Sequence, residues 1–170
     1  MIFVTVGTQL PFDRLVMAVD AWARARKRSD IIAQTGTSLY APHSLEVRPF
    51  LRAQEFRRLV GDCQLLVAHA GMGSILTALD LGKPILVMPR RADLSEHRND
   101  HQLATVAGLA HISQVCVADH VEAIAPAMDR LLAQEHRVDG CRRGVASSEL
   151  ILAVRGFLLG DKEGETYAST

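Results

Sequence analysis

The feature that most constrains the fold is a regular alternation of short apolar runs with longer amphipathic stretches along the chain. The runs have the length of buried strands, and the stretches between them have the spacing of helices with one apolar face. We expect strands at 2–6, 31–35, 45–48, 64–68, 84–88 and 112–117, and helices at 12–26, 53–63, 74–81, 97–108, 121–134 and 144–159. Because strands that alternate with helices form a parallel sheet covered on both faces, the pattern predicts an α/β, Rossmann-like domain with about six strands.

One domain accounts for this whole pattern. A chain of 170 residues can bury one self-sufficient core, and the connections between the predicted elements are too short to hold a second domain. We expect this domain to span residues 1–160. Residues 161–170 are polar and contain glycine, so we expect them to form a disordered tail.

Charge and cysteine usage argue against several function classes. The 19 basic and 19 acidic side chains balance, which does not suit a protein that neutralises nucleic-acid phosphates. Cys63, Cys116 and Cys141 are odd in number and far apart, so we expect no disulfide framework and no zinc site, and a reducing cytosol suits the chain. The N-terminus does not have the pattern of a signal peptide, and the longest apolar stretch, 65–81, is interrupted too often to predict a membrane span.

Three unusual segments follow predicted strands. Gly7-Thr8-Gln9 follows the first strand, residues 69–74 follow the fourth, and Pro89-Arg90-Arg91 follows the fifth. Ligands of parallel α/β sheets bind beyond the carboxyl ends of the strands. We therefore expect the three segments along one rim of the sheet.

The segment 69–74 is the most informative of the three. Gly71 and Gly73 allow the backbone to approach a ligand and expose amides at the start of a helix. Ser74 is placed to cap that helix and to donate to a phosphate oxygen, and His69 is placed to donate to a second phosphate. These features suit a diphosphate. A glycine-rich turn that only closes a strand–helix junction beside a core histidine accounts for them equally well.

Charged residues follow the fifth strand. Because adjacent side chains point to different sides, at most one of Arg90 and Arg91 is expected to face the rim, and a solvated pair is the alternative. Asp93, Glu96 and His97 lie in the next loop, where each is a candidate general base, and a partner domain is the alternative source of the base. No Asp-x-Asp element, Walker motif or Gly-x-Ser-x-Gly elbow occurs, so we expect no metal ion and no cofactor.

Taken together, these motifs resemble a known family. Residues 3–9, 69–76, 82–89 and 101–102 resemble the C-terminal, donor-binding domain of glycosyltransferase family 28. Residues 89–91 and 96–102 are most similar to the small catalytic subunits of two-component bacterial exopolysaccharide and capsule glycosyltransferases. Those subunits are similar in turn to the catalytic subunit of the dolichol-diphosphate UDP-N-acetylglucosamine transferase. The resemblance covers residues 1–135.

The resemblance implies a fold and a function. The fold is the C-terminal half of a GT-B enzyme, and the activity is an inverting, UDP-sugar-dependent hexosyl- or glycuronosyltransfer to a lipid-diphosphate-linked saccharide in exopolysaccharide synthesis. A membrane-anchored partner subunit is implied for the acceptor half of the cleft and for contact with the membrane. The chain itself is then expected in the cytoplasm, peripheral at the inner membrane face, in a heteromeric complex without nucleic acid.

The resemblance also implies roles for individual residues. The donor site comprises Gly7, Thr8, His69, Gly71, Gly73, Ser74, Thr77, His101 and Gln102, and the catalytic candidates are Arg90, Arg91, Glu96 and His97. His69 and Ser74 are implied to hold the diphosphate, and His101-Gln102 to face the sugar. One departure concerns Thr77, which stands where related domains have a glutamate that binds both ribose hydroxyls. Asp80, one helical turn further on, is the nearest substitute.

Two other functions remain open at this point. The missing ribose glutamate favours a non-catalytic nucleotide-sugar-binding or regulatory subunit. A homodimeric UDP-sugar epimerase or hydrolase is the other alternative, because those epimerases share the two-domain fold.

Overall fold

The computed structural model describes residues 1–98, 102, 106, 109, 112 and 114–135. The strands are β1 (Ile2–Thr5), β2 (Ile31–Gln34), β3 (Glu46–Val47), β4 (Leu65–His69), β5 (Ile85–Met88) and β6 (Val115–Val117). The helices are α1 (Asp13–Arg26), α2 (Ala53–Asp62), α3 (Met72–Asp80) and α5 (Ile124–Glu135), with a short 3-10 turn, η1 (Val121–Ala123), before α5. The predicted helix at 144–159, the domain end at 160 and the tail 161–170 lie outside the described residues, as does most of the predicted helix at 97–108.

The strands form one parallel sheet, as the sequence pattern predicts. Its order is β3-β2-β1-β4-β5-β6, and every pair of neighbours is parallel. The register places Ala33, Val4, Val67 and Leu86 side by side across four strands. These side chains are all buried on the same face of the sheet, so their alignment gives one continuous apolar layer.

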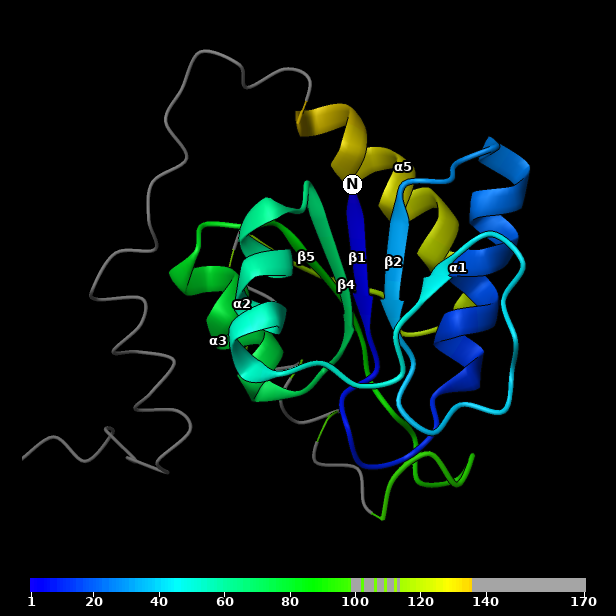
Figure 1. The fold of residues 1–170 in the computed structure, drawn as a ribbon. Coiled ribbons are helices and arrows are strands. Elements are labelled where there is room, and N and C mark those ends of the chain that lie inside the picture. The colour runs from blue at the N-terminus through cyan, green and yellow to red at the C-terminus, as the bar shows by residue number, and fades with distance from the viewer. Residues whose placement is uncertain (99–101, 103–105, 107–108, 110–111, 113, 136–170) are drawn as a thin grey trace, which may run out of the picture.

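Helices cover both faces of the sheet (Figure 1). Val4 on β1 belongs to the core between the sheet and α1 and α5, where Val16 and Met128 pack. Its neighbour Phe3 points the other way and packs in the core under α2 and α3, beside Ile75. This two-sided burial explains why the strands read as unbroken apolar runs rather than as alternating ones. Among the described helices, none is long and apolar enough to cross a membrane.

Candidate functional site

The order of the strands creates a crevice between β1 and β4. From β1 the chain proceeds to β2 and β3 on one side, and from β4 it proceeds to β5 and β6 on the other. Such a reversal leaves an open crevice at the carboxyl ends of the two central strands, where ligands of this class of sheet bind. The segments after β1 and β4, Gly7-Thr8-Gln9 and residues 69–74, therefore meet at this point, as the sequence predicts.

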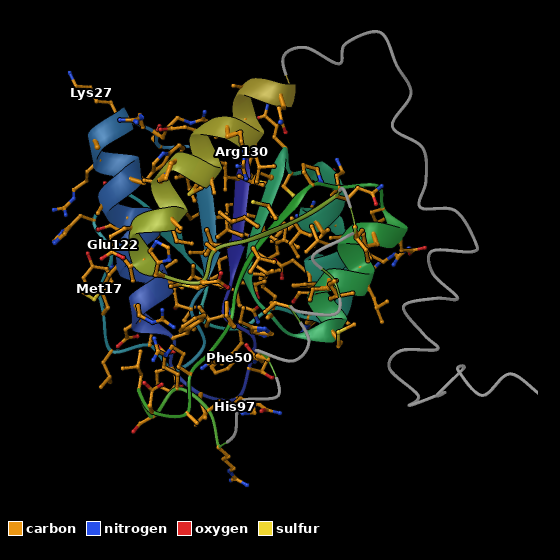
Figure 2. The ribbon with its side chains drawn as sticks, turned by 180° about the vertical axis from the view of Figure 1, so that it is seen from behind. Met17, Lys27, Phe50, His97, Glu122 and Arg130 are labelled. Atoms are coloured by element: carbon orange, nitrogen blue, oxygen red, sulfur yellow. The ribbon has the colours of Figure 1, made fainter. Side chains whose placement is uncertain are left out.

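A cleft of about 630 Å³ occupies this crevice. It is lined by residues from the β1–α1 loop, the ends of β2 and β4, the first turns of α2 and α3 and the segment after β5: Thr5, Val6, Gly7, Thr8, Gln9, Leu10, Gln34, Leu51, Ala53, Phe56, His69, Gly71, Gly73, Ser74, Thr77, Arg90, His97 and Gln102. Figure 2 shows Phe50 and His97 at the same end of the molecule and Lys27 at the opposite end. The cleft thus brings together most of the predicted donor residues.

The imidazole of His69 lies between two glycines. A Cβ built on Gly71 would overlap its Cε1 and Nδ1, and a Cβ built on Gly7 would overlap Nε2 and stand 2.9 Å from Cδ2. Gly7 also has a φ of 77°, which L residues with a side chain rarely adopt. Gly7 and Gly71 therefore make room for the histidine ring itself, in addition to any ligand.

His69 is held in its neutral form. Burial, followed by the nearby charges of Arg90 and His97, lowers the pKa of the imidazole from 6.5 to about 3. Nδ1 is buried and is the one described buried side-chain nitrogen or oxygen without a hydrogen-bond partner. Such unpartnered atoms are rare in folded proteins, so Nδ1 is a polar atom that the fold itself leaves without a hydrogen bond.

The start of α3 differs from the sequence expectation. The predicted helix begins at Ser74, but α3 begins at Met72 and its N-cap is Gly71, with no side-chain cap. The amides of Ser74 and Ile75 bond to the Gly71 carbonyl, so Ser74 lies inside the first turn and does not cap the helix. Its nearly buried side chain lines the cleft together with Gly73. The first turn of α3 therefore directs its amide end and a hydroxyl at the cleft.

Thr77 and Asp80 have separate surroundings. Thr77 lines the cleft, and its hydroxyl donates to the Gly73 carbonyl at 2.7 Å, which leaves its lone pairs to accept a bond. The carboxylate of Asp80 forms an ion pair with Arg57 on α2 at 2.6 Å, and Asp80 is absent from the cleft lining. Asp80 therefore does not take the place of the ribose-binding glutamate in this structure.

Arg90 and Arg91 point to different sides, as expected. Arg90 is buried, and its guanidinium donates to four backbone carbonyls, those of Val6, Leu10, Pro11 and Glu96, at 2.6–2.9 Å. Arg91 is exposed and pairs with Asp93 at 2.6 Å. Arg90 lines the cleft, and these bonds occupy four of the five N–H donors that an arginine has.

Glu96 also has a structural environment. Its carboxylate accepts two bonds from Arg14 on α1, both at 2.7 Å, and one from the amide of Arg91 at 3.0 Å. A carboxylate held in this way is a poor general base, and Glu96 is absent from the cleft lining. Of the predicted catalytic residues, His97 and the buried Arg90 line the cleft.

The predicted pair His101-Gln102 is described in part. The side-chain oxygen of Gln102 accepts a bond from the amide of Arg90 at 3.0 Å, and Gln102 lines the cleft. This bond uses the side-chain oxygen of Gln102 and leaves its NH₂ group to bind other partners. His101 lies outside the described residues.

Two walls of the cleft are made by residues that the sequence pattern did not single out. Gln34 ends β2, where its side-chain oxygen accepts a bond from the buried hydroxyl of Thr5 at 2.7 Å. Leu51 and Phe56 form an apolar wall, and Phe56 packs edge-to-face on Phe3 with ring centroids 5.6 Å apart. A polar residue at the end of an apolar run was the available signal for Gln34. Phe56 reads from sequence as an ordinary core residue of an amphipathic helix.

The electrostatics of the cleft favour an anion. No aspartate or glutamate is among the described residues that line it, and no cluster of metal-binding side chains occurs among the described residues. The first residue of α2, Ala53, and the first turn of α3 both border the cleft, so two helix N-termini meet there. Helix N-termini attract negative charge, which suits a phosphate-containing ligand with an apolar group against Phe56.

Solved structures share this fold. The chain superposes on the UDP-GlcNAc 2-epimerase from Neisseria meningitidis bound to UDP-GlcNAc with a TM-score of 0.57 at 13% identity, over 94% of this chain and 43% of that one. It superposes on the glycosyltransferase SnogD from Streptomyces nogalater with a TM-score of 0.51 at 21% identity, over 90% of this chain and 36% of that one. The solution structure of ALG13 gives a TM-score of 0.55 at 16% identity, over 92% of this chain and 94% of that one. The chain thus spans less than half of the two enzymes and nearly all of ALG13.

No curated protein matches the chain. A family model does match it, over residues 1–137, which include β1 to β6 and the whole described cleft. This Rossmann-like domain, whose fold matches that of the C-terminal half of GT-B glycosyltransferases, thus belongs to the glycosyltransferase family 28 C-terminal domain family.

Proposed function

We propose that the chain is the donor-binding catalytic subunit of a split, inverting glycosyltransferase. It binds a UDP-sugar in the cleft at the β1–β4 switch point, and a membrane-anchored partner brings a lipid-diphosphate-linked saccharide to the reaction. The proposal places this transfer in exopolysaccharide synthesis at the inner membrane face, without a metal ion or cofactor.

The observation that carries the proposal is the composition of the cleft. Its described lining has two helix N-termini, His69 and Ser74, but no carboxylate. In the proposed reaction, the acceptor oxygen bonds to the anomeric carbon on the side opposite UDP, and the bond from that carbon to the β-phosphate oxygen breaks. The electron pair of the broken bond leaves on UDP, so negative charge grows at the diphosphate. Donors aimed there are worth about 2.7–4 kcal/mol each in comparable sites.

The same composition supports a separate partner. The acceptor hydroxyl must lose its proton to a general base, and His97 is the one titratable cleft residue in the described part of the chain besides the buried His69 and Arg90. We therefore assign the base to His97 or to the partner subunit.

Reconstitution tests this proposal. The purified chain is assayed for transfer of labelled sugar from several UDP-sugars to membrane lipid extract, alone and with a candidate membrane-anchored subunit. We expect transfer only when both proteins are present. Robust transfer by the chain alone would contradict the split-enzyme proposal.

A non-catalytic nucleotide-sugar-binding subunit is the second candidate. The absence of a carboxylate from the described cleft, with Thr77 at the ribose position and Asp80 paired to Arg57, favours it. Binding of UDP without turnover in every reconstituted mixture would select this function.

A further inference from the structure

We infer that Arg90 is a positioning residue that fixes the β1–α1 loop across the mouth of the cleft. This inference rests on the proposed function, because it concerns the loop that lines the proposed donor site. It assigns to Arg90 an action through the backbone of residues 6–11 instead of a contact with the donor.

The hydrogen bonds of Arg90 carry the inference. Nη2 donates to the carbonyls of Val6 and Leu10 at 2.7 and 2.6 Å, and Nη1 donates to the carbonyl of Pro11 at 2.7 Å. Three bonds from one planar group thus reach both ends of a loop that contains Gly7, Thr8 and Gln9. A planar group with fixed donor directions allows the loop little freedom.

The face of the guanidinium is occupied as well. It lies over the ring of Phe12, with Cζ of Arg90 4.8 Å from the ring centroid. Cζ of Arg14 lies 5.3 Å from the same centroid. Phe12 is fully buried and immediately precedes α1, so this stacking fixes the end of the loop to the core. Arg90 is 3% exposed, and burial lowers its pKa while the charge of Glu96 opposes that effect.

A second contact ties this loop to the segment after β5. Nη1 of Arg90 also donates to the carbonyl of Glu96 at 2.9 Å, while the Glu96 carboxylate accepts from Arg14. The loops after β1 and after β5 therefore share one set of buried bonds. Since the loop after β1 places Gly7 against the imidazole of His69, Arg90 also determines how closely that ring is enclosed.

The alternative is that Arg90 only stabilises the fold. That role predicts a lower melting temperature, an unchanged UDP affinity of the folded protein, and faster hydrogen exchange of backbone amides throughout the chain. A positioning role predicts a local change confined to residues 6–12 and 91–97, together with weaker UDP binding. Arg91 provides a matched control, because it is the adjacent arginine but is exposed and paired with Asp93.

The test compares the full chain with Arg90→Lys, Arg90→Met and Arg91→Met by hydrogen exchange and by calorimetric titration with UDP. We expect both Arg90 variants to exchange at least tenfold faster in residues 6–12 than the wild type, with β4 and β5 unchanged, and to bind UDP at least tenfold more weakly. Lysine is expected to fail as a rescue because one nitrogen cannot reach all of the carbonyls. If Arg90→Met does not fold, Arg90→Lys decides. The inference would be overturned if the folded variants exchange residues 6–12 at the wild-type rate or bind UDP with wild-type affinity. A wild-type protein that does not bind UDP would refute the proposed function, but the exchange result would still test the role of Arg90.

Discussion

Gly71 packs so closely on the imidazole of His69 that a methyl group on its Cα would overlap the ring. Gly71 itself has an ordinary extended conformation, with φ at −89° and ψ at 132°. Glycine is therefore required at this position because a Cβ would not fit, and not because the backbone conformation excludes other residues. This distinguishes it from Gly7, which needs both.

The substitution Gly71→Ala tests this packing. We expect a loss of about 1–3 kcal/mol in the free energy of unfolding, because the ring must move within a packed site. Urea unfolding measures the loss, and calorimetry is expected to show weaker UDP binding. Gly61→Ala, on α2 and outside the cleft lining, is the matched control, since a Cβ there meets nothing within 4 Å. Equal stability of Gly71→Ala and the wild type would contradict the close contact.

The neutral state of His69 predicts a dependence of stability on pH. The folded chain keeps the ring unprotonated down to a pKa of about 3, whereas the unfolded chain takes up the proton near 6.5. Between these values the unfolded state binds more protons, so the free energy of unfolding falls by about 1.4 kcal/mol for each pH unit below about 6.

Urea unfolding at pH 6, 5 and 4 checks this slope against that of His69→Asn. The variant lacks the titrating ring and is expected to show a slope smaller by about one proton. The lowered pKa values of Asp30 and Asp129, held by Arg28 and Arg26, act at lower pH and are common to both proteins. Identical slopes in the two proteins would show that His69 is not buried in its neutral form.

Much of the fold was predictable from the sequence, for a physical reason. Strands buried on both faces are apolar throughout, so the predicted run 31–35 lies within one residue of β2 at Ile31–Gln34. The start of α3 was placed two residues late because serine is a favoured N-cap. In the structure Gly71 is the N-cap, and it lies against the ring of His69.

The role of Arg90 was not predictable in the same way. The sequence placed an arginine at the rim as a catalytic candidate. Its actual partners are mostly carbonyls about 80 positions away along the chain. Because every residue type has a backbone carbonyl, such partners leave no mark on the sequence.

Ser74→Ala is expected to weaken UDP binding while the fold is retained. The hydroxyl lies nearly buried in the cleft at the first turn of α3, where a phosphate oxygen is proposed to bind. A hydrogen bond to a charged group is worth about 1.5–3 kcal/mol, which corresponds to an affinity loss of about tenfold or more. Calorimetry with UDP measures it, and Thr37→Ala, on an exposed residue that is not part of the cleft lining, serves as the control. Unchanged affinity in Ser74→Ala would show that the phosphate does not bind beside Ser74.

Asp20 predicts a stability effect outside the cleft. Burial alone would raise the pKa of this carboxyl, but bonds from Tyr40, Ser44 and His43 outweigh burial and hold the pKa below its usual value. The carboxylate joins α1 to the β2–β3 connection through these bonds, at 2.7–3.1 Å. We expect Asp20→Ala to cost about 2–3 kcal/mol and Tyr40→Phe, which removes one bond, about 1 kcal/mol in urea unfolding. A smaller loss for Asp20→Ala than for Tyr40→Phe would contradict this account.

Thr77→Glu is expected to increase the affinity for UDP. Thr77 lines the cleft on α3, and its hydroxyl donates to the Gly73 carbonyl, so it can offer a ribose hydroxyl only an acceptor. A glutamate at this position reaches further and accepts from both ribose hydroxyls. Two bonds to a charged acceptor in place of one bond to a hydroxyl correspond to a gain of about tenfold, since each charge-assisted bond is worth about 1.5–3 kcal/mol.

Calorimetry with UDP and with 2′-deoxy-UDP measures the gain and its origin, because the variant is expected to lose most of its advantage on the deoxy nucleotide. Asp80→Ala is the control, since that carboxylate is paired with Arg57 outside the cleft and its removal is expected to leave UDP affinity unchanged. A variant that binds UDP no better than the wild type, or that gains equally on both nucleotides, would show that the ribose does not lie beside Thr77.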